Sequence, residues 1–201
     1  MEISEIVKTT EFIAALSGVV AGFFFTLLSD LARSLVRRWV RKFQISREVK
    51  MIKEDSRSAI KTCIENNKIR RGSKKSPLMH ASLDCYVIED KGMLLDAGLS
   101  ISQRRSLRDV ELISEAIVKE CETLRQHSLD YRPKIEWESS NINICHYFAF
   151  IVYACDEYLC NSSSTSEPVN GEQFHERNEE VLSHVERKYK IEIPRDIRRP
   201  A

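Results

Sequence analysis

The chain has 201 residues, 30% of them charged, and its formal net charge is only +1. It contains six glycines and no G-x-x-x-x-G-K, H-E-x-x-H or G-x-S-x-G pattern, which excludes the nucleotide-binding and hydrolase classes that these motifs mark. About 155 residues remain beyond the first 44, enough for one modest domain.

A run without a single charge, from Phe12 to Leu28, is the first element. A membrane-spanning helix needs about 17–25 mostly apolar residues, so the run predicts a short span. Its polar side-chain atoms belong to Ser17 and Thr26, and both hydroxyls can bond to the backbone of their own helix.

The flanks of the run differ in charge. Before it come three acidic residues and one lysine, and after it come five basic residues: Arg33, Arg37, Arg38, Arg41 and Lys42. Cytoplasmic flanks are the ones rich in Lys and Arg. We therefore expect a single-pass protein of the inner (cytoplasmic) membrane, with its amino terminus outside and its carboxyl-terminal domain in the cytoplasm.

Three other interpretations of the run stay open. A cleaved signal peptide would have a basic leader, whereas this leader is acidic. The buried helix of a soluble domain remains an alternative because the run is at the short end for a span. An interfacial helix would carry one apolar stripe, but here apolar residues surround the helix.

Two stripes of the run bear on assembly. Ala14, Gly18 and Gly22 form a small-xxx-small pattern, which lets two helix backbones approach closely and predicts a homo-oligomer interface. Thr26, Asp30, Arg33 and Arg37 share a second stripe. Ionisable residues at membrane depth face a bundle interior or a water-filled pore. The alternative is that Asp30 and Arg33 simply lie at the level of the cytoplasmic headgroups.

The small net charge hides an asymmetry. Residues 33–75 hold 15 Lys and Arg against 4 Asp and Glu, an excess of +11, so the remaining residues sum to −10. The predicted partner is a lipid bilayer with anionic headgroups, with Arg38, Trp39 and Arg41 at the membrane interface beside Phe43. RNA or DNA and a merely solvated face are the alternatives.

Helical periodicity runs through most of the remaining chain. The first helix should continue to Phe43, followed by a bend or fresh start at Ser46 and a second helix to about Arg70. A loop is expected at 72–77, and residues 78–103 are ambiguous. There 83–90 form a short strand or part of a helix, and turns fall at 91–92 and 96–100.

The carboxyl-terminal half should hold three helices. They are expected at about 103–126, from 139 or 140 to 160, and at about 172–190, with the middle one as the central core helix. Pro194 and Pro200 interrupt the segment beyond. The predicted fold is mainly α, an amino-terminal transmembrane helix continuing into a cytoplasmic helical bundle. The domain boundaries are 1–44 for the membrane and juxtamembrane helix, 45–190 for the bundle and 191–201 for a basic tail.

The six cysteines show no Cys-x-x-Cys spacing. On the cytoplasmic side of a membrane we expect reduced thiols that act as small buried hydrophobic groups. The spacing of Cys145, His146 and Cys160 is wrong for the usual zinc clusters. No metal and no cofactor are predicted.

One pair of residues in the last helix could carry chemistry. Arg177 and His184 lie seven positions apart, nearly two turns, and share a face at the edge of the apolar stripe; Asn178 follows the arginine. An arginine to bind phosphate and a histidine as acid–base suit RNA cleavage. This resembles the Arg-x(4–6)-His motif of HEPN ribonucleases, at its longest spacing. An ordinary surface arginine and helix histidine are the alternative.

The layout as a whole resembles the small single-span membrane accessory proteins encoded beside the RNA-targeting effector of type VI-B CRISPR loci. The matching parts are the run Phe12–Leu28, the helices from 46 to 190, and Arg177 with His184. The resemblance implies a homo-oligomeric membrane pore that supports anti-phage defence without catalysis, with an RNA-guided CRISPR effector or RNA as further partners. A membrane-tethered HEPN ribonuclease and an anchored adaptor that only binds a partner protein remain alternatives.

Overall fold

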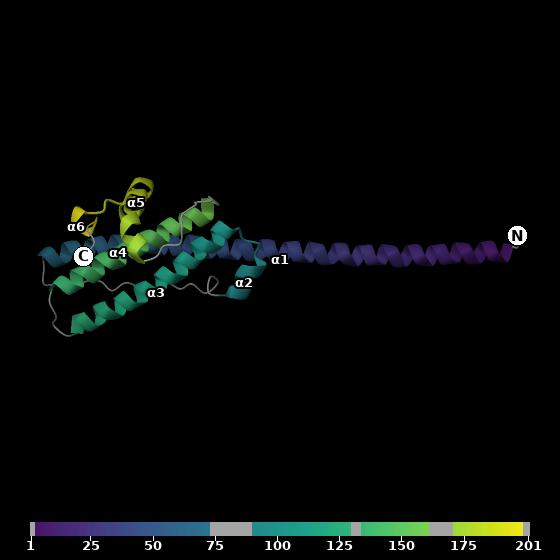
Figure 1. Cartoon of the computed structure of the whole chain (residues 1–201), viewed down its shortest axis with the longest axis horizontal. Coiled ribbons are helices and arrows are strands. Elements are labelled where there is room, and N and C mark those ends of the chain that lie inside the picture. Colours follow the sequence, from purple (N-terminus) through teal and green to yellow (C-terminus); the bar gives the residue numbers. More distant parts are fainter. Residues whose placement is uncertain (1–2, 73–89, 130–133, 161–170, 199–201) are drawn as a thin grey trace.

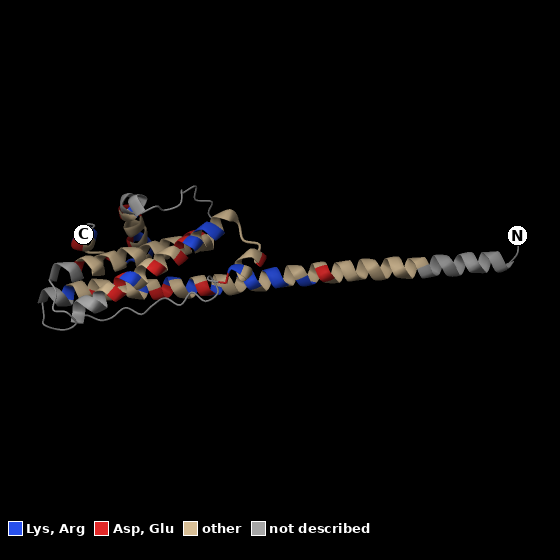
Figure 2. Ribbon diagram, turned by 60° about the horizontal axis from the view of Figure 1, so that its bottom comes forward, with Lys and Arg blue, Asp and Glu red and all other residues tan. Residues whose placement is uncertain are grey.

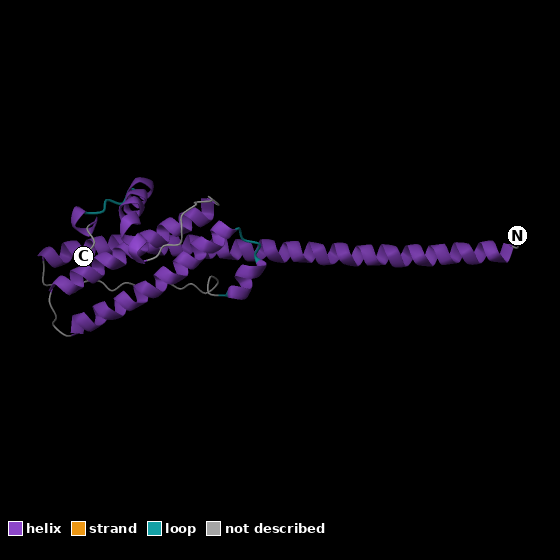
Figure 3. Ribbon diagram, viewed as in Figure 1, coloured by secondary structure: helices purple, strands orange, loops and turns teal. Residues whose placement is uncertain are grey.

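The computed structural model describes residues 3–72, 90–129, 134–160 and 171–198, and all regular secondary structure in these ranges is helical (Figure 3). The predicted mainly α fold, a long apolar amino-terminal helix followed by further helices, is confirmed. The loops expected at 73–77 and 161–170, the strand or helix at 83–89, Cys85 and Pro200 lie outside the described residues.

Helix α1 (Ile3–Gly72) is one uninterrupted rod of 70 residues, about 105 Å long at 1.5 Å per residue. Its amino-terminal part projects far from the rest of the molecule, and the other helices gather around its carboxyl-terminal part (Figure 1). The bend or restart expected at Ser46 is wrong. No Pro or Gly lies nearby to break the helix, and the Ser46 hydroxyl lies 3.4 Å from the hydroxyl of Tyr158 instead of capping a new helix.

Helix α4 (Lys134–Cys160) is the centre of the bundle. It packs against α1 on one side and α3 (Ile101–Leu129) on another, and α5 (Gly171–Tyr189) lies on it as well. Its fully buried side chains include Ile144, Phe148, Ile151 and Val152. The prediction of a central core helix is therefore confirmed.

Each neighbouring helix turns its apolar face toward the core. Leu107, Val110, Ile113 and Ile117 of α3 are buried, as are Val181, Leu182 and Val185 of α5. On α1 burial begins at Ile45 and continues through Val49, Ile52, Ile60 and Cys63. Apolar periodicity alone identified these faces because each helix has one side against α4.

Several helix boundaries differ from the expectation because of capping side chains. The turn predicted at 91–92 is wrong: helix α2 (Lys91–Asp96) begins there, since the Asp90 carboxylate accepts a hydrogen bond of 3.1 Å from the backbone N–H of Met93. Helix α3 starts at Ile101 because Ser100 and Gln103 cap it reciprocally, at 3.2 Å each.

The turn expected at 96–100 is present, with Gly98 at a φ of 62°, a left-handed conformation that glycine adopts without strain. Helix α4 begins at Lys134, ahead of the predicted start at the serines. Ser140 lies buried inside the helix rather than at its cap.

The segment predicted as a basic tail is, over residues 191–198, part of the packed bundle. Ile191, Ile193 and Ile197 are buried, and residues Arg195–Arg198 form the short helix α6. Arg198 forms ion pairs with Glu179 and Glu186 of α5. The prolines marked a break in the helix, but three isoleucines at spacings of two and four positions decide where the segment packs.

None of the cysteines within the described ranges forms a disulfide bond. Three of them, Cys63, Cys145 and Cys155, are fully buried, which confirms the expectation of small buried hydrophobic groups for these positions. Burial, reinforced by the neighbouring Cys145 thiol, raises the pKa of Cys63 well above its ordinary value. This thiol therefore stays protonated and inert.

Candidate functional site

The most conspicuous surface is the projecting part of α1. Every side chain from residue 16 to residue 40, which we call the free half of α1, is exposed, and Phe25 is 79% exposed. The helix is long and apolar enough to cross a membrane, and no part of its apolar stretch is buried against the bundle. Soluble monomers do not leave so large an apolar surface in water. Within the described chain, this stretch of the helix is therefore not a buried core helix.

The predicted small-residue face is open. A side chain built on Gly18 or Gly22 would meet no atom within 4 Å, so nothing in the described chain occupies this face. The side chain of Ala14 lies outside the described part. The Thr26 hydroxyl donates a 2.9 Å hydrogen bond to the carbonyl of Gly22, which satisfies this polar group without water, as predicted.

The four arginines that follow the apolar stretch lie together on one side of α1. Arg33, Arg37, Arg38 and Arg41 line a hollow of about 390 Å³, the basic hollow, with Asp30, Ser34 and Asp96 completing its wall. Figure 2 shows the first basic residues where the apolar stretch of α1 ends. Arg41 forms an ion pair with Asp96 near the end of α2, and the Arg33 guanidinium lies 4.0 Å from the Asp30 carboxylate.

Trp39 points away from this hollow. It lies two positions before Arg41, or about 200° around the helix, is 69% exposed, and stacks on Phe43 with ring centroids 6.0 Å apart. The stretch after the predicted span is therefore amphipathic, with arginines on one side and Leu31, Leu35 and Trp39 on the other. The membrane-interface role that the sequence predicts for Trp39 stays a prediction.

The structure places the three HEPN-like residues in three different environments. Arg177 and His184 are half-buried on the same side of α5, as the spacing predicted, but Asn178 is buried. Tyr153 of α4 neighbours both of them: it lines a cavity with Arg177 and meets the His184 ring edge-on, with centroids 5.1 Å apart.

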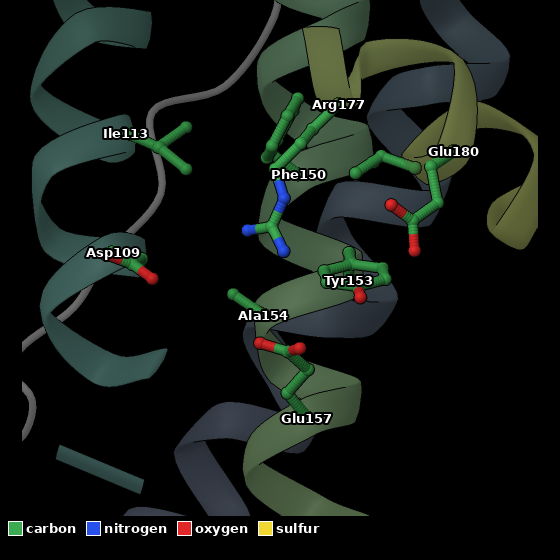
Figure 4. Close-up of a pocket in the computed structure, with 9 residues that line it drawn as sticks. Asp109, Ile113, Phe150, Tyr153, Ala154, Glu157, Arg177 and Glu180 are labelled. Atoms are coloured by element: carbon green, nitrogen blue, oxygen red, sulfur yellow. The ribbon is translucent and has the colours of Figure 1, made fainter. Parts of the chain in front are cut away.

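Arg177 reaches into a cavity between α3, α4 and α5 (Figure 4). Its guanidinium points into the space between the Asp109 and Glu157 carboxylates. Burial, followed by repulsion from Glu157, raises the pKa of Asp109 to about 6, against the opposing effect of nearby arginines. The cavity measures about 20 Å³, room for about one water molecule and far below the size of a ligand pocket.

His184 belongs to a cluster centred on the Asp156 carboxylate, which is 6% exposed. The acid accepts hydrogen bonds from His184 Nε2 at 3.0 Å and from the Tyr189 hydroxyl at 2.6 Å, and Lys188 Nζ lies at 3.0 Å. Lys53 of α1 lies 3.6 Å away. We call these five side chains the aspartate cluster. It ties α1, α4 and α5 together.

Two opposing effects set the pKa of Asp156. Burial by itself would raise it, but the hydrogen bonds from Tyr189, His184 and Lys188 outweigh burial and lower the pKa below its ordinary value. The carboxylate is thus charged at neutral pH. Burial and the same hydrogen bond to Asp156 raise the pKa of Tyr189, so its hydroxyl stays a donor.

Asn178 completes a second buried network. Its side-chain amide donates to Nδ1 of His146 over 2.9 Å, and His146 Nε2 donates to the carbonyl of Ile197. This arrangement fixes the tautomer of His146 with its proton on Nε2. The network links α4, α5 and α6, which is why the carboxyl-terminal segment packs where it does.

Sequence reasoning missed the roles of Asp156, His146, Tyr189 and Lys53. A signal was present, because His146, Asp156 and Glu157 interrupt the apolar segment of the core helix, and buried polar groups need partners. Their partners lie on other helices, which only the packing brings near. Within the described ranges, no three His, Cys, Asp or Glu side chains gather as ligands for a metal ion.

Comparison of the chain with models of protein families, with curated proteins and with solved structures gives no match in any of the three.

Proposed function

We propose that the chain is a single-span membrane protein that assembles with copies of itself through α1. The observation that carries the proposal is the free half of α1, which no other part of the described chain covers. Burying apolar surface contributes about 25 cal/mol per Å². A helix that exposes phenylalanines, leucines and valines all round its surface is therefore stable only within lipid or against other chains.

The apolar stretch is long enough to cross the hydrocarbon core of a thin membrane. The run from Phe12 to Leu28 spans about 26 Å at 1.5 Å per residue, slightly less than the hydrocarbon thickness of about 30 Å. The arginines beyond it would extend their charged heads into the headgroup layer. The basic side would face the cytoplasm, which puts the bundle inside the cell.

Self-association is supported by a second pattern. Apolar residues recur at alternating spacings of three and four along α1: Gly18, Ala21, Phe25, Leu28, Ala32, Leu35 and Trp39. We call this line the seam. Inside the charge-free run any line of positions would be apolar, so the seam carries no information there. Beyond Leu28 the seam continues as far as Trp39, and none of the arginines lies on it. A period of about 3.5 residues is the pattern of a helix that packs along another helix.

A second copy is the occupant that suits the seam best. Copies inserted in the same direction hold identical seams at the same height above the membrane. Leu35 and Trp39 lie about 9 and 15 Å along the helix axis beyond Ser29, while the headgroup layer is about 5–7 Å thick. Lipid tails do not reach these side chains on an upright helix, and both are more than half exposed in the single chain.

The activity that we propose for the assembly is membrane permeability. The rods would surround or line a pore, and the bundles would set the spacing between copies. The resemblance in layout to the type VI-B accessory proteins extends the proposal to anti-phage defence, with an RNA-guided effector or RNA as further partners of the assembly.

The geometry gives the ribonuclease alternative no specific support. His184 is hydrogen-bonded to Asp156, the Arg177 guanidinium points into the space between two carboxylates, and the cavity beside it has room for about one water molecule. We propose that these side chains join helices rather than cut RNA. An adaptor role would use the same anchor without a pore.

Two glutamate variants test the assembly. Leu35→Glu places a charge on the seam, whereas Val40→Glu places the same charge about 140° around the helix, at a position that is also exposed. We expect full-length wild type and Val40→Glu to resist carbonate extraction and to give cross-linked ladders in membranes. Leu35→Glu should resist extraction but lose the ladder.

Each outcome has a defined meaning. Wild-type protein that carbonate releases from membranes would contradict the span, and a wild type that sediments as a monomer in detergent would contradict self-association. Gly18→Leu with Gly22→Leu tests the small-residue face, because the added bulk would separate the backbones. Pore formation itself requires that wild type, but not Leu35→Glu, releases a dye from vesicles. If wild-type protein cleaves RNA, and Arg177→Ala and His184→Ala each abolish the cleavage, the ribonuclease alternative would be favoured instead.

A further inference from the structure

The basic hollow holds more positive charge than its own residues neutralise. Four guanidiniums line it against two carboxylates, Asp30 and Asp96. Asp96 is paired with Arg41, and Asp30 lies beside Arg33. Among the described residues, no carboxylate lies within ion-pair distance of Arg37 or Arg38. The hollow therefore has two guanidiniums to offer an anion.

The hollow is built by two helices rather than by a charged stripe alone. Asp96 belongs to α2, whose own start is fixed by the Asp90 cap. Gly98, just beyond α2, brings the backbone to the Arg38 stem: a side-chain carbon placed on Gly98 would lie 4.0 Å from Arg38 Cδ. These contacts close the hollow at the end away from the apolar run and orient two of its arginines.

The end of the hollow nearer the apolar run lies at the height of the lipid headgroups. Arg33 lies about 6 Å and Arg37 about 12 Å along the axis from Ser29, and the headgroup layer extends about 5–7 Å from the hydrocarbon. Arginine side chains bridge the remaining distance by reaching toward the phosphates. The planar guanidinium also binds a phosphate through two parallel N–H donors.

We propose that the basic hollow is a binding site for the phosphate headgroup of one anionic phospholipid per chain, held by Arg37 and Arg38 and closed by α2. The inference rests on the proposed membrane span and adds a specific lipid site to it. The Arg41–Asp96 ion pair sets the strength of the site, because Asp96 withdraws one guanidinium from the lipid. Removing the Asp96 charge should tighten lipid binding.

The test uses the detergent-solubilised full-length protein titrated with phosphatidylglycerol, with the fraction carrying one lipid measured by native mass spectrometry. Arg38→Gln removes a guanidinium from the hollow. Lys42→Gln removes a charge one turn further along α1 and about 40° around it from Arg38, outside the residues that line the hollow. We expect Arg38→Gln to weaken lipid binding about fivefold, Lys42→Gln to leave it unchanged, and Asp96→Asn to strengthen it.

Equal losses in Arg38→Gln and Lys42→Gln would overturn the site in favour of diffuse attraction between charges. Asp96→Asn distinguishes an effect on the site from an effect on folding, since a damaged fold would not bind lipid more tightly. If phosphatidylcholine binds as well as phosphatidylglycerol, the site does not select anionic lipid. If glycerol 3-phosphate displaces the lipid at equal concentration, the site takes free phosphate instead. Carbonate extraction, run in parallel, separates failure of the span from failure of the site.

Discussion

The two halves of α1 share one secondary structure and meet different surroundings. From residue 16 to residue 40 every side chain is exposed, whereas between Ile45 and Asn67 one face is buried in the bundle. The free half is apolar all round as far as Leu28 and carries its charges only beyond that residue, whereas the bundle half carries charges on its outer face. Both halves are therefore helical although their surroundings differ. The distribution of apolar residues around the helix decides which environment stabilises each half.

The comparison also separates two kinds of polar group. At the end of the free half, four arginines gather on one exposed side with few counter-charges. In the bundle, the Asp156 carboxylate is surrounded by donors from α1 and α5. Exposed charges in excess remain available to an outside partner, whereas buried charges are satisfied inside the fold. Changes in the two regions should accordingly affect different measurements.

The largest effect is expected in the bundle. Phe148→Ala removes a fully buried ring from the central helix and should lower the free energy of unfolding by about 3–5 kcal/mol. Leu112→Ala, at a position that is 50% exposed, should cost less than about 1 kcal/mol. Thermal unfolding in detergent measures both. The two halves would not be independent if Phe148→Ala also released the protein from membranes.

In the free half, Val20→Arg should oppose membrane insertion by about 2.5–3.5 kcal/mol and move protein to the soluble fraction, while the bundle keeps its thermal midpoint. The matched control is Val40→Arg, beyond the charge-free run among other arginines, which should stay in the membrane. Fractionation after carbonate washing measures both. Equal partitioning of the two variants would show that the run does not span the membrane.

Asp156→Asn should lower the free energy of unfolding by about 2 kcal/mol, less than the usual cost of breaking a buried ion pair. Lys188 is 41% exposed, so solvent screening reduces the loss. Because the pKa of Asp156 is lowered in the folded protein, its contribution is complete at neutral pH. It is lost as the pH falls from about 4 through the lowered value. Asp55→Asn, on the exposed face of α1, should change neither stability nor its pH dependence.

Asp109→Asn should act in the opposite direction and more weakly. The pKa of Asp109 is raised to about 6 by burial, so the folded state favours the protonated acid, and its contribution to stability declines as the pH rises from about 4 to 6. At pH 7 the neutral amide should raise the free energy of unfolding by about 1 kcal/mol, after discounting for partial exposure. Unfolding at pH 4 and pH 7 tests this: a variant less stable than wild type at pH 7 would contradict it. Glu122→Gln, exposed on α3, serves as the control.

Much of the candidate site was predictable, and the part that was not depends on long-range contacts. The basic residues after the run and the shared face of Arg177 and His184 follow from spacing along one helix. The hollow does not, because Asp96 lies 55 residues from Arg41. The link between His184 and Asp156 spans 28 residues, and no helical period relates positions on different helices.

The sequence by itself determined local features: the helices, their apolar faces, and a charge-free run in α1 that is apolar on every side. A period of about 3.6 residues and an uninterrupted apolar surface are properties of one segment, so they survive without knowledge of the rest. The tertiary structure alone decided that Ser46 contacts Tyr158 rather than capping a helix and that Ile191, Ile193 and Ile197 complete the core. It also decided that Asp156 is charged inside the bundle. Each of these depends on which distant side chain supplies a hydrogen bond or covers an apolar surface, and that is settled only when the helices pack.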